Sequence, residues 1–305
     1  MCAADHVYVH VPFCDGKCRY CALYSVCFAP DSADCFLKAL ECEMDMRANE
    51  EGIPGPETVY LGGGSPSVLD TGRLERLLSM LRQKISFRNV VEFSVEVNPG
   101  TLDREKCLVL RDAGVNRVSA GAQSFSDKVL AVAGRRHCAE DISRSFAILR
   151  ESGIENLGID LISCLPSANP VSMNMSVNRA IALKPDHVSV YALSIDPGTL
   201  LEEDVRKGAF VPPDEEQAIK SSAAANQLLE QSGYGRYEIS NYSLPGRECL
   251  HNLSAWRGED YLGFGPSAHS TWQGRRWWNL GSLDRWLDAI SAGRLPEAGG
   301  ELLDR

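Results

Sequence analysis

Short apolar runs alternate with longer amphipathic stretches along most of the chain, and this alternation limits the folds available to it. Runs rich in β-branched residues predict strands, and stretches with the spacing of a helix face predict helices. The predicted strands are Val7–Val11, Thr58–Leu61, Val91–Val97, Arg117–Ala120, Leu157–Ile162 and His187–Leu193. The predicted helices are Ala33–Glu50, Thr71–Lys84, Asp103–Ala113, Ala139–Ser152, Ser172–Leu183 and Asp214–Ser232. Strand–helix units in series predict an α/β fold, in which helices cover a parallel sheet.

The number of these units distinguishes an open barrel from a closed one. A closed (β/α)₈ barrel needs eight units, whereas the pattern supplies six. We therefore expect a partial (β/α)₆ TIM-like barrel. In such a barrel the functional site lies at the carboxyl ends of the strands.

Tryptophan distribution sets the end of the chain apart. All five tryptophans follow residue 250, at Trp256, Trp272, Trp277, Trp278 and Trp286. We therefore expect two units with a boundary near Arg236. Residues 1–235 would form the partial barrel, and residues 236–305 a small tryptophan-rich C-terminal subdomain.

Charge and hydropathy exclude some partners and locations. The net charge of −10 over 305 residues disfavours nucleic acid or an anionic membrane surface as the main partner. The sequence contains no apolar run of about 18 residues, so we expect no membrane span. The first strand begins near His6, which leaves no room for an export signal before it. We therefore expect a cytoplasmic protein with reduced thiols.

The cysteines point to a metal centre rather than to disulfides. The chain has 11 of them, an odd number, and it is not a small secreted domain. Cys14, Cys18 and Cys21 follow the first strand directly, with spacing Cys-x₃-Cys-x₂-Cys. Three thiolates can hold three irons of a [4Fe–4S] cube and leave the fourth iron open to an external ligand. Zinc is the alternative, with Cys27 or His10 as its fourth ligand.

A glycine-rich turn follows the second predicted strand, one strand–helix unit after the cysteine loop. It reads Gly62-Gly63-Gly64-Ser65-Pro66. Consecutive glycines let the backbone approach a ligand where a Cβ atom would obstruct it. Glycine-rich turns are common, so it is the position of this turn beside the cysteine loop that indicates ligand binding.

Several ordered motifs together resemble a known superfamily. They are Tyr8-Val-His-Val-Pro-Phe-Cys14, the cysteine triplet, the glycine turn, Glu96-Val-Asn98-Pro99-Gly100, Gly121-Ala-Gln123-Ser124-Phe125, Gly134-Arg135, Asp160-Leu161-Ile162, Tyr237-Glu-Ile-Ser-Asn241 and His251-Asn252. Over nearly its whole length the chain resembles the radical S-adenosylmethionine (SAM) superfamily. Within it, the chain is similar to the family of oxygen-independent coproporphyrinogen III dehydrogenases and the heme chaperone HemW.

The resemblance implies a set of cofactor-binding residues. Cys14, Cys18 and Cys21 would hold the cluster, and SAM would chelate its open iron. The matching SAM contacts are Gly63, Gly64 and Ser65 at the methionine end, Glu96, Gln123, Arg135 and Asp160 at successive strand ends, and Tyr8 and Tyr20 flanking the cluster. Charge supports this set, because a carboxylate can receive the ammonium group of SAM and a guanidinium its carboxylate. For each residue taken singly, the alternative is a structural ion pair or helix cap.

The resemblance leaves two branches of the family open. In the family, an electron donor such as flavodoxin or ferredoxin reduces the cluster, SAM is cleaved, and the resulting radical takes a hydrogen atom from the substrate. An oxidoreductase of the coproporphyrinogen dehydrogenase type would use this chemistry. The dehydrogenases carry a further cysteine where this chain has Leu23, and they have an N-terminal extension that is not seen here. Both differences favour the chaperone branch.

The chaperone branch implies a heme or porphyrin ligand and a heme-acceptor protein. His251-Asn252-Leu253-Ser254-Ala255-Trp256 resembles the chaperone signature, with Ala255 in place of its tyrosine. His251 would then ligate heme iron, and Trp256, Tyr261, Trp272, Trp277 and Trp278 would offer aromatic surface. The alternative is that the tryptophans pack a core and His251 makes local contacts.

Two further expectations concern the whole chain. Family members continue into a small helical domain about where this sequence stops, so we expect that domain to be missing. A plain iron–sulfur or zinc module without SAM is a third possibility. The glycine turn and the polar strand ends argue against that module.

Overall fold

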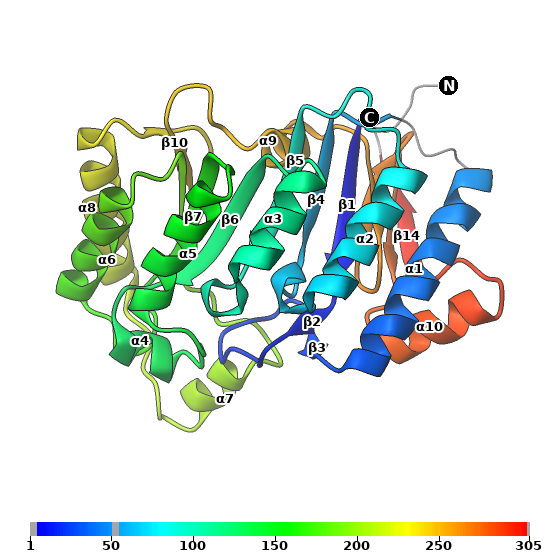
Figure 1. The fold of residues 1–305 in the computed structure, drawn as a ribbon. Helices are drawn as coiled ribbons and strands as arrows, with labels where there is room; N and C mark the ends of the chain where they lie inside the picture. Colours follow the sequence, from blue (N-terminus) through cyan, green and yellow to red (C-terminus); the bar gives the residue numbers. More distant parts are fainter. Residues whose placement is uncertain (1–4, 51–54, 304–305) are drawn as a thin grey trace.

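The computed structural model describes residues 5–50 and 55–303 (Figure 1). Its central strands are β1 (His6–Val11), β4 (Thr58–Gly63), β5 (Glu92–Val97), β6 (Arg117–Gln123), β7 (Asn156–Ser163), β8 (His187–Ala192) and β11 (Tyr261–Phe264). The outer and short strands are β2 (Phe13–Cys14), β3 (Val26–Cys27), β9 (Gly235–Arg236), β10 (Asn241–Ser243), β12 (His269–Trp272), β13 (Arg275–Asn279) and β14 (Glu297–Leu302).

The helices follow the strands in the order that the sequence predicts. They are α1 (Pro30–Glu50), α2 (Thr71–Lys84), α3 (Arg104–Asp112), α4 (Asp127–Val132), α5 (Ala139–Glu151), α6 (Pro170–Ala182), α7 (Leu200–Arg206), α8 (Glu215–Gln231), α9 (Leu250–Arg257) and α10 (Leu283–Ser291). Two single-turn 3₁₀ helices, Pro66–Val68 and Pro99–Thr101, follow β4 and β5. Within the described residues, no helix has both the length and the apolar character needed to cross a membrane.

Twelve of these strands form one sheet with the order β14-β13-β12-β11-β1-β4-β5-β6-β7-β8-β10-β9, and β2 and β3 pair separately with each other. Neighbours from β11 to β8 pair in parallel, and the outer strands pair antiparallel. The two ends of this sheet do not pair with each other, so the barrel is open. The predicted α/β partial (β/α)₆ barrel is therefore confirmed, with β11 as a parallel strand that was not predicted.

The sheet continues past residue 236 at both of its ends. At one end β10 pairs with β8, and at the other β11 pairs in parallel with β1, where Val7 lies opposite Leu262. Trp277 and Trp286 are fully buried, and the Trp286 ring lies 5.6 Å from the ring of Phe36 on α1. The segment 236–305 thus adds strands to the same sheet. Its division from residues 1–235 as a separate subdomain stays a prediction.

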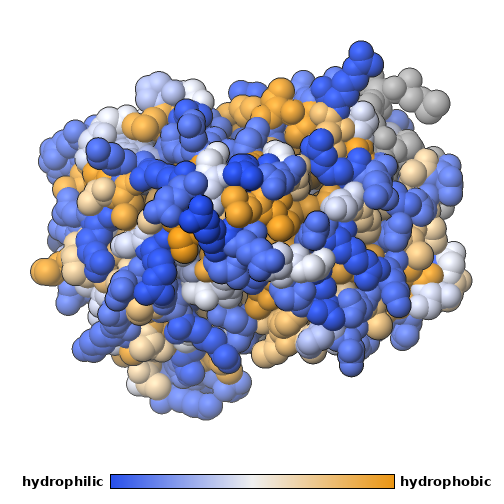
Figure 2. Space-filling model, viewed as in Figure 1, coloured by the Kyte–Doolittle hydropathy of each residue, from blue (hydrophilic) through white to orange (hydrophobic). Residues whose placement is uncertain are grey.

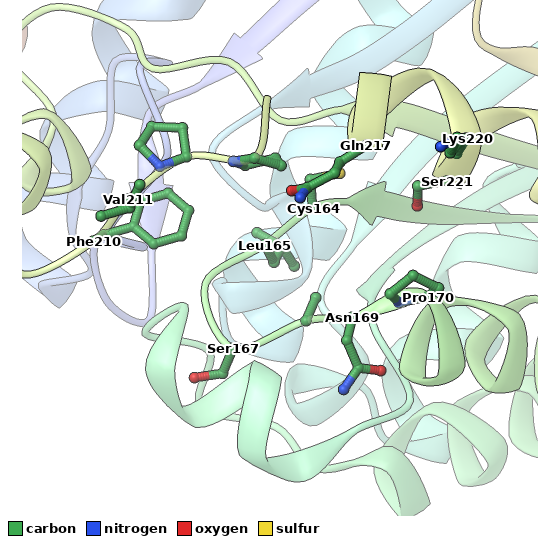
Figure 3. A pocket seen from close by; sticks show the side chains of 13 residues that line it. Cys164, Leu165, Ser167, Asn169, Pro170, Phe210, Val211, Gln217, Lys220 and Ser221 are labelled. Atoms are coloured by element: carbon green, nitrogen blue, oxygen red, sulfur yellow. The ribbon is translucent and has the colours of Figure 1, made fainter. Parts of the chain in front are cut away.

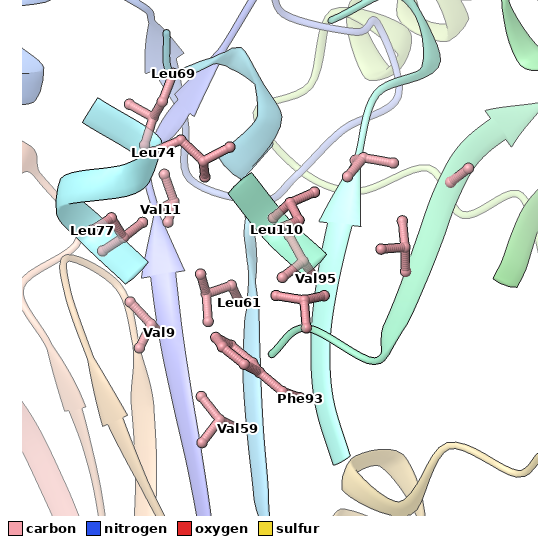
Figure 4. Close-up of a cluster of buried hydrophobic side chains, with 14 of the residues drawn as sticks. Val9, Val11, Val59, Leu61, Leu69, Leu74, Leu77, Phe93, Val95 and Leu110 are labelled. Carbon is pink, nitrogen blue, oxygen red and sulfur yellow. The ribbon is translucent and has the colours of Figure 1, made fainter. Parts of the chain in front are cut away.

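Helices α2 and α3 pack on one face of β1, β4 and β5 (Figure 4). The contacting side chains are Val9, Val11, Val59, Leu61, Phe93 and Val95 from the strands, and Leu74, Leu77 and Leu110 from the helices. Helix α2 begins after Asp70, whose side chain accepts a hydrogen bond from the backbone N–H of Arg73 at 3.0 Å. Full burial of each such aliphatic side chain contributes about 1.5–3 kcal/mol.

The opposite, solvent-facing side of these helices is mostly hydrophilic. Figure 2 shows hydrophilic residues over most of that face, with hydrophobic residues in small scattered groups. The alternation of apolar and polar positions along each helix explains this surface, since only the apolar stripe faces the sheet.

Candidate functional site

The cysteine loop lies at the carboxyl end of β1, where the fold places its site. Backbone hydrogen bonds hold it, because Arg19 N–H donates to the Ala133 carbonyl at 3.0 Å and Phe28 N–H to the Cys14 carbonyl at 2.9 Å. Cys14, Cys18 and Cys21 are free, partly exposed thiols that line one cavity of about 260 Å³. Burial raises the pKa of Cys14 to about 11, so a bound cation is needed to hold its thiolate at neutral pH.

The zinc alternative does not fit this geometry. Cys27 is exposed and does not line the cavity. His10 is engaged at both ring nitrogens, with Nε2 2.9 Å from the Tyr24 carbonyl and Nδ1 3.1 Å from the Tyr8 hydroxyl. Among residues 5–50 and 55–303, no three His, Cys, Asp or Glu side chains are grouped to hold a single metal ion. A cube does not require such a group, since each cysteine binds a different iron.

The structure brings most of the predicted cofactor residues to this one cavity. It is lined by Tyr20, Gly63, Gly64, Ser65, Glu96, Gln123, Arg135 and Asp160, together with the three cysteines. The cysteines and Tyr20 come from the segment after β1, and Arg135 follows α4. The other residues come from β4 to β7 and from the turn after β4. Parallel strands thus gather residues that lie far apart in the sequence at one edge of the sheet.

Glu96 and Asp160 are partly buried acids inside the open barrel. The Tyr60 hydroxyl donates to Glu96 Oε1 at 2.8 Å, and the Ser189 hydroxyl donates to Asp160 Oδ1 at 2.7 Å. Burial raises the pKa of Glu96 to about 7, with the nearby Asp160 raising it further against the Tyr60 hydrogen bond. Burial also raises the pKa of Asp160. Both carboxyls would gain from a cationic ligand, which removes part of this penalty.

Arg135 lies between the cysteine loop and the strand ends. Its Nη2 donates to Asn98 Oδ1 at 2.7 Å and to the Gly121 carbonyl at 2.6 Å, while Nη1 lies 3.5 Å from Cys18 Sγ. Arg135 Nε and Gln123 Oε1 are buried without a hydrogen-bond partner in the described part of the chain. Buried polar atoms without partners are costly, so these two atoms fit a polar ligand that satisfies them.

Sequence reasoning missed the part of Asn98 in this site. Its side chain accepts from Arg135, and its Nδ2 donates to Asp15 Oδ1 at 3.3 Å beside the cysteine loop. Its backbone N–H donates to Ser65 Oγ at 3.0 Å, so Ser65 braces two strand ends. Asn98 belongs to the motif Glu96-Val-Asn98-Pro99-Gly100, and this motif is the sequence feature that could have identified it. Tyr191 from β8 also lines the cavity.

The glycine turn is needed for packing against the cysteine strand. Gly63 has φ +101°, and a Cβ there would lie 2.6 Å from the His10 ring. A Cβ at Gly64 would collide with the carbonyl of Phe13. The glycines therefore let the turn approach the segment that leads into Cys14. This is a packing reason beside the predicted approach to a ligand.

Tyr8 and His251 lie in a second cavity of about 370 Å³ instead of the first. Its lining also includes His10, Leu23, Tyr24, Ala255, Tyr261 and His269. Leu23 lines both cavities and is 57% exposed, so the two cavities adjoin at this side chain. The predicted role of Tyr8 beside the cluster stays a prediction.

His251 stands in the first turn of α9 and is partly buried. Its Nδ1 lies 2.7 Å from Thr58 Oγ1, and its ring stacks on Tyr60 with centroids 5.0 Å apart. Burial lowers the pKa of His251 to about 3, and His6 and Arg117 lower it further. The imidazole is therefore neutral at physiological pH, which is the form that binds metals.

Three of the tryptophans pack in the core, and within the described residues none of the five lines this cavity. Trp277 and Trp286 are fully buried, and Trp272 is 8% exposed. Trp256 is 58% exposed on α9. Of the aromatic residues expected to face a macrocycle, Tyr261 alone lines the second cavity in the described residues. The alternative of core packing is therefore correct for Trp272 and Trp277.

A third cavity of about 470 Å³ lies between the loop after β7 and the segment before α8 (Figure 3). Leu165, Phe210 and Val211 give it a mainly apolar lining beside Cys164 and Lys220. It contains none of the predicted site residues.

The open parallel barrel and its three-cysteine loop define a radical SAM protein. Residues 8–179 match the model of the Radical SAM superfamily. The chain is 36% identical over 290 residues to heme chaperone HemW of Bacillus subtilis (strain 168), covering 95% of this chain and 76% of that protein. It is 35% identical over 285 residues to heme chaperone HemW of Lactococcus lactis (strain IL1403), covering 93% and 74%. The chain therefore belongs to the HemW family within the radical SAM superfamily.

A solved structure agrees with this placement. The structure of coproporphyrinogen III oxidase (HemN) from Escherichia coli, described as a radical SAM enzyme, matches with a TM-score of 0.87 and 27% sequence identity. The match covers 99% of this chain and 73% of that one.

Proposed function

We propose that this protein is a heme chaperone, which binds heme and passes it to acceptor proteins. The observation that carries the proposal is His251, a neutral histidine that lines the second cavity directly beside the cysteine cavity. The relatives named heme chaperone HemW support it, since they match almost the whole chain. Heme is therefore the ligand proposed for the second cavity.

The first cavity would hold the cluster and SAM. Cys14, Cys18 and Cys21 would bind three irons, which leaves one iron for SAM. Glu96 and Arg135 would bind the charged groups of SAM, and Asp160 would accept from its ribose hydroxyls. When bound, the cluster and SAM supply one-electron chemistry at a sulfonium group, with flavodoxin or ferredoxin as the proposed type of electron donor.

The chain's own residues prepare this cavity for a cation. Glu96 and Asp160 bring negative charge into the barrel, and the hydroxyls of Tyr60, Ser119 and Ser189 hold them by hydrogen bonds. Arg135 places positive charge next to Cys18, with Nη1 3.5 Å from its Sγ. We place the protein in the cytoplasm as part of this proposal.

The second candidate is an oxygen-independent coproporphyrinogen III dehydrogenase, or another radical SAM enzyme that modifies porphyrins. The similarity to HemN over nearly the whole chain is the observation in its favour. Leu23, where the dehydrogenases are expected to carry cysteine, opposes it. Leu23 is exposed between the two cavities, so a thiol at this position would face both.

Anaerobic reconstitution followed by two assays on one sample separates these functions. The chaperone predicts heme binding with a histidine-type absorbance spectrum and no decarboxylation of coproporphyrinogen III in the presence of SAM and reductant. The dehydrogenase predicts decarboxylated product. Turnover of coproporphyrinogen without heme binding would overturn our proposal.

Two histidine variants locate the ligand within the second cavity. His251→Ala should lose the histidine-type heme spectrum, whereas His269→Ala should keep it. Both side chains line the cavity, so the pair controls for a general loss of imidazole. Loss of the spectrum in His269→Ala alone would show that His269, and not His251, ligates the heme iron.

A further inference from the structure

Four side chains form a hydrogen-bonded line behind the second cavity. They are Glu259, His6, Thr58 and His251, which come from the turn after α9, from the first residues of β1 and β4, and from α9 itself. Glu259 Oε2 lies 3.0 Å from His6 Nε2, His6 Nδ1 lies 2.9 Å from Thr58 Oγ1, and Thr58 Oγ1 lies 2.7 Å from His251 Nδ1. His6 and Thr58 are almost completely buried, at 3% and 1% exposure.

The direction of each hydrogen bond follows from the chemistry of the groups. An ionised carboxylate only accepts, so His6 Nε2 carries the proton that is donated to Glu259. When this is the only proton on the His6 ring, the other nitrogen, Nδ1, is an acceptor, and the single hydroxyl proton of Thr58 is donated to it. The Thr58 oxygen is left to accept from His251, which must therefore be protonated at Nδ1.

This order leaves the second nitrogen of His251 with a free lone pair. His251 Nε2 has no hydrogen-bond partner within residues 5–50 and 55–303, and it is not among the fully enclosed unpartnered atoms. It is therefore the ring nitrogen left to face the cavity that His251 lines.

We propose that Glu259, His6 and Thr58 are positioning residues that fix His251 as its Nδ1-protonated tautomer, so that Nε2 is the atom offered to the iron of a metalloporphyrin. This inference rests on the proposed heme function and extends it from one ligand to the residues behind it. A partner that fixes the tautomer of a ligating histidine also fixes its ring and raises its basicity.

Other contacts hold the same ring in place. Glu92, at the start of β5, accepts from the backbone N–H groups of Leu250 at 2.8 Å and His251 at 3.2 Å. Glu92 thus caps α9, whose own N-cap residue Cys249 makes no side-chain cap. The stacked Tyr60 ring, at an interplanar angle of 25°, defines the plane of the imidazole. Since these contacts already hold the ring, the main effect of Glu259, His6 and Thr58 is to determine which nitrogen of His251 carries the proton.

The test reads the tautomer directly, without relying on heme. The reconstituted protein with ¹⁵N-labelled histidine is examined by NMR at a pH of about 8, where imidazoles of ordinary pKa, about 6.5, are neutral. His251→Gln identifies the ring signals by their loss. We expect wild type and Thr58→Ser to show a protonated Nδ1 and an unprotonated Nε2, because serine keeps the hydroxyl.

Thr58→Val keeps the shape of the side chain and removes the hydroxyl. We expect it to shift His251 towards protonation at Nε2 and to weaken heme binding about 10–100-fold, the usual effect of losing such a partner. Thr71→Val, on α2 and outside the second cavity, is the matched control and should change neither readout. Circular dichroism and cluster absorbance check that each variant is folded.

The outcomes separate this inference from the proposed function. Wild-type His251 protonated at Nε2, or a tautomer and heme affinity unchanged in Thr58→Val, would overturn the inference even if heme binds. The predicted tautomer in a wild type that binds no heme would support the hydrogen-bond order and overturn the heme function instead.

Discussion

Glu43 on α1 gives the sharpest prediction about stability. Its side chain is completely buried where α1 meets the C-terminal strands. Glu43 Oε2 accepts from the backbone N–H of Gly265 at 2.8 Å, and Oε1 accepts from Asn279 Nδ2 at 2.6 Å. Burial outweighs these hydrogen bonds and the nearby Arg47, and it raises the pKa of Glu43 to about 7 from an ordinary value of 4.5.

The sign of the pH effect follows from this raised pKa. The folded protein holds the Glu43 proton up to about pH 7, whereas the unfolded chain releases it near 4.5. The contribution of this group to the free energy of unfolding is thus fully present below the unfolded pKa and is lost as pH rises through the folded one. At about 1.4 kcal/mol per pKa unit, the loss between about pH 5 and about pH 8 is about 2.5 kcal/mol.

Glu43→Gln removes the titration and keeps the shape of the side chain. Urea unfolding of wild type and variant at about pH 5 and about pH 8 gives the difference in free energy of unfolding at each pH. We expect the variant to gain about 2.5 kcal/mol relative to wild type on going to the higher pH. Any fixed cost of the amide cancels in this comparison.

Glu41→Gln on the same helix is the control. Its carboxyl is 46% exposed and lies 3.6 Å from Lys84 Nζ, so water reaches it. We expect the same small change in the free energy of unfolding at both pH values. If the gain of Glu43→Gln over wild type between the two pH values is below about 1 kcal/mol, or has the opposite sign, the assignment of a buried carboxyl with a raised pKa is refuted.

Three further changes test the cluster, the SAM contacts and the core. Cys18→Ala should lose the cluster, because two thiolates do not secure the cube, and a normal iron content would contradict this. Arg135→Ala should weaken SAM binding about tenfold or more in equilibrium dialysis while iron is retained, since a charged hydrogen bond contributes about 1.5–3 kcal/mol. The exposed Glu155→Ala serves as its control, and unchanged affinity in Arg135→Ala would remove that residue from the site. Phe93→Ala should lower the free energy of unfolding by about 3–5 kcal/mol in urea, and a loss below about 1 kcal/mol would show that the core collapses around it.

Local periodicity accounts for what the sequence revealed about the fold. The six predicted strands and six predicted helices are present, with ends that differ by a few residues. Their apolar faces have to be buried, so the pattern of side chains determines the elements. Strand β11 was missed because Tyr261–Phe264 is short and contains a glycine. Its parallel pairing with β1 joins residues about 250 positions apart, which no local pattern encodes.

The sequence likewise identified some residues of the candidate site correctly and could not place others. Cysteine spacing and motif order pointed to the residues of the first cavity, because most of them lie in or just after neighbouring parallel strands. Position along the chain could not separate Tyr8 and His251 from them. That separation depends on how far along the barrel axis each side chain lies, and on α9 closing the opposite end. The positions of the tryptophans in the sequence likewise did not show which of them are buried.

One pair of strands places both cavities on a common face. Side chains alternate along a strand, so His6, Tyr8 and His10 of β1 face the barrel interior together with Thr58, Tyr60 and Gly62 of β4, their partners in register. The intervening Val9 and Val59 face the helices (Figure 4).

Tyr60 stands midway along this face and touches both sites. Its hydroxyl donates to Glu96 in the first cavity, and its ring stacks on His251 in the second. Gly62 leaves room for the same carboxylate, since a Cβ there would lie 2.9 Å from Glu96 Oε2. The two sites therefore lie one after the other along the same polar face of β1 and β4 inside the barrel. Tyr60 therefore connects the two sites, since one side chain contacts both the Glu96 carboxylate and the His251 ring.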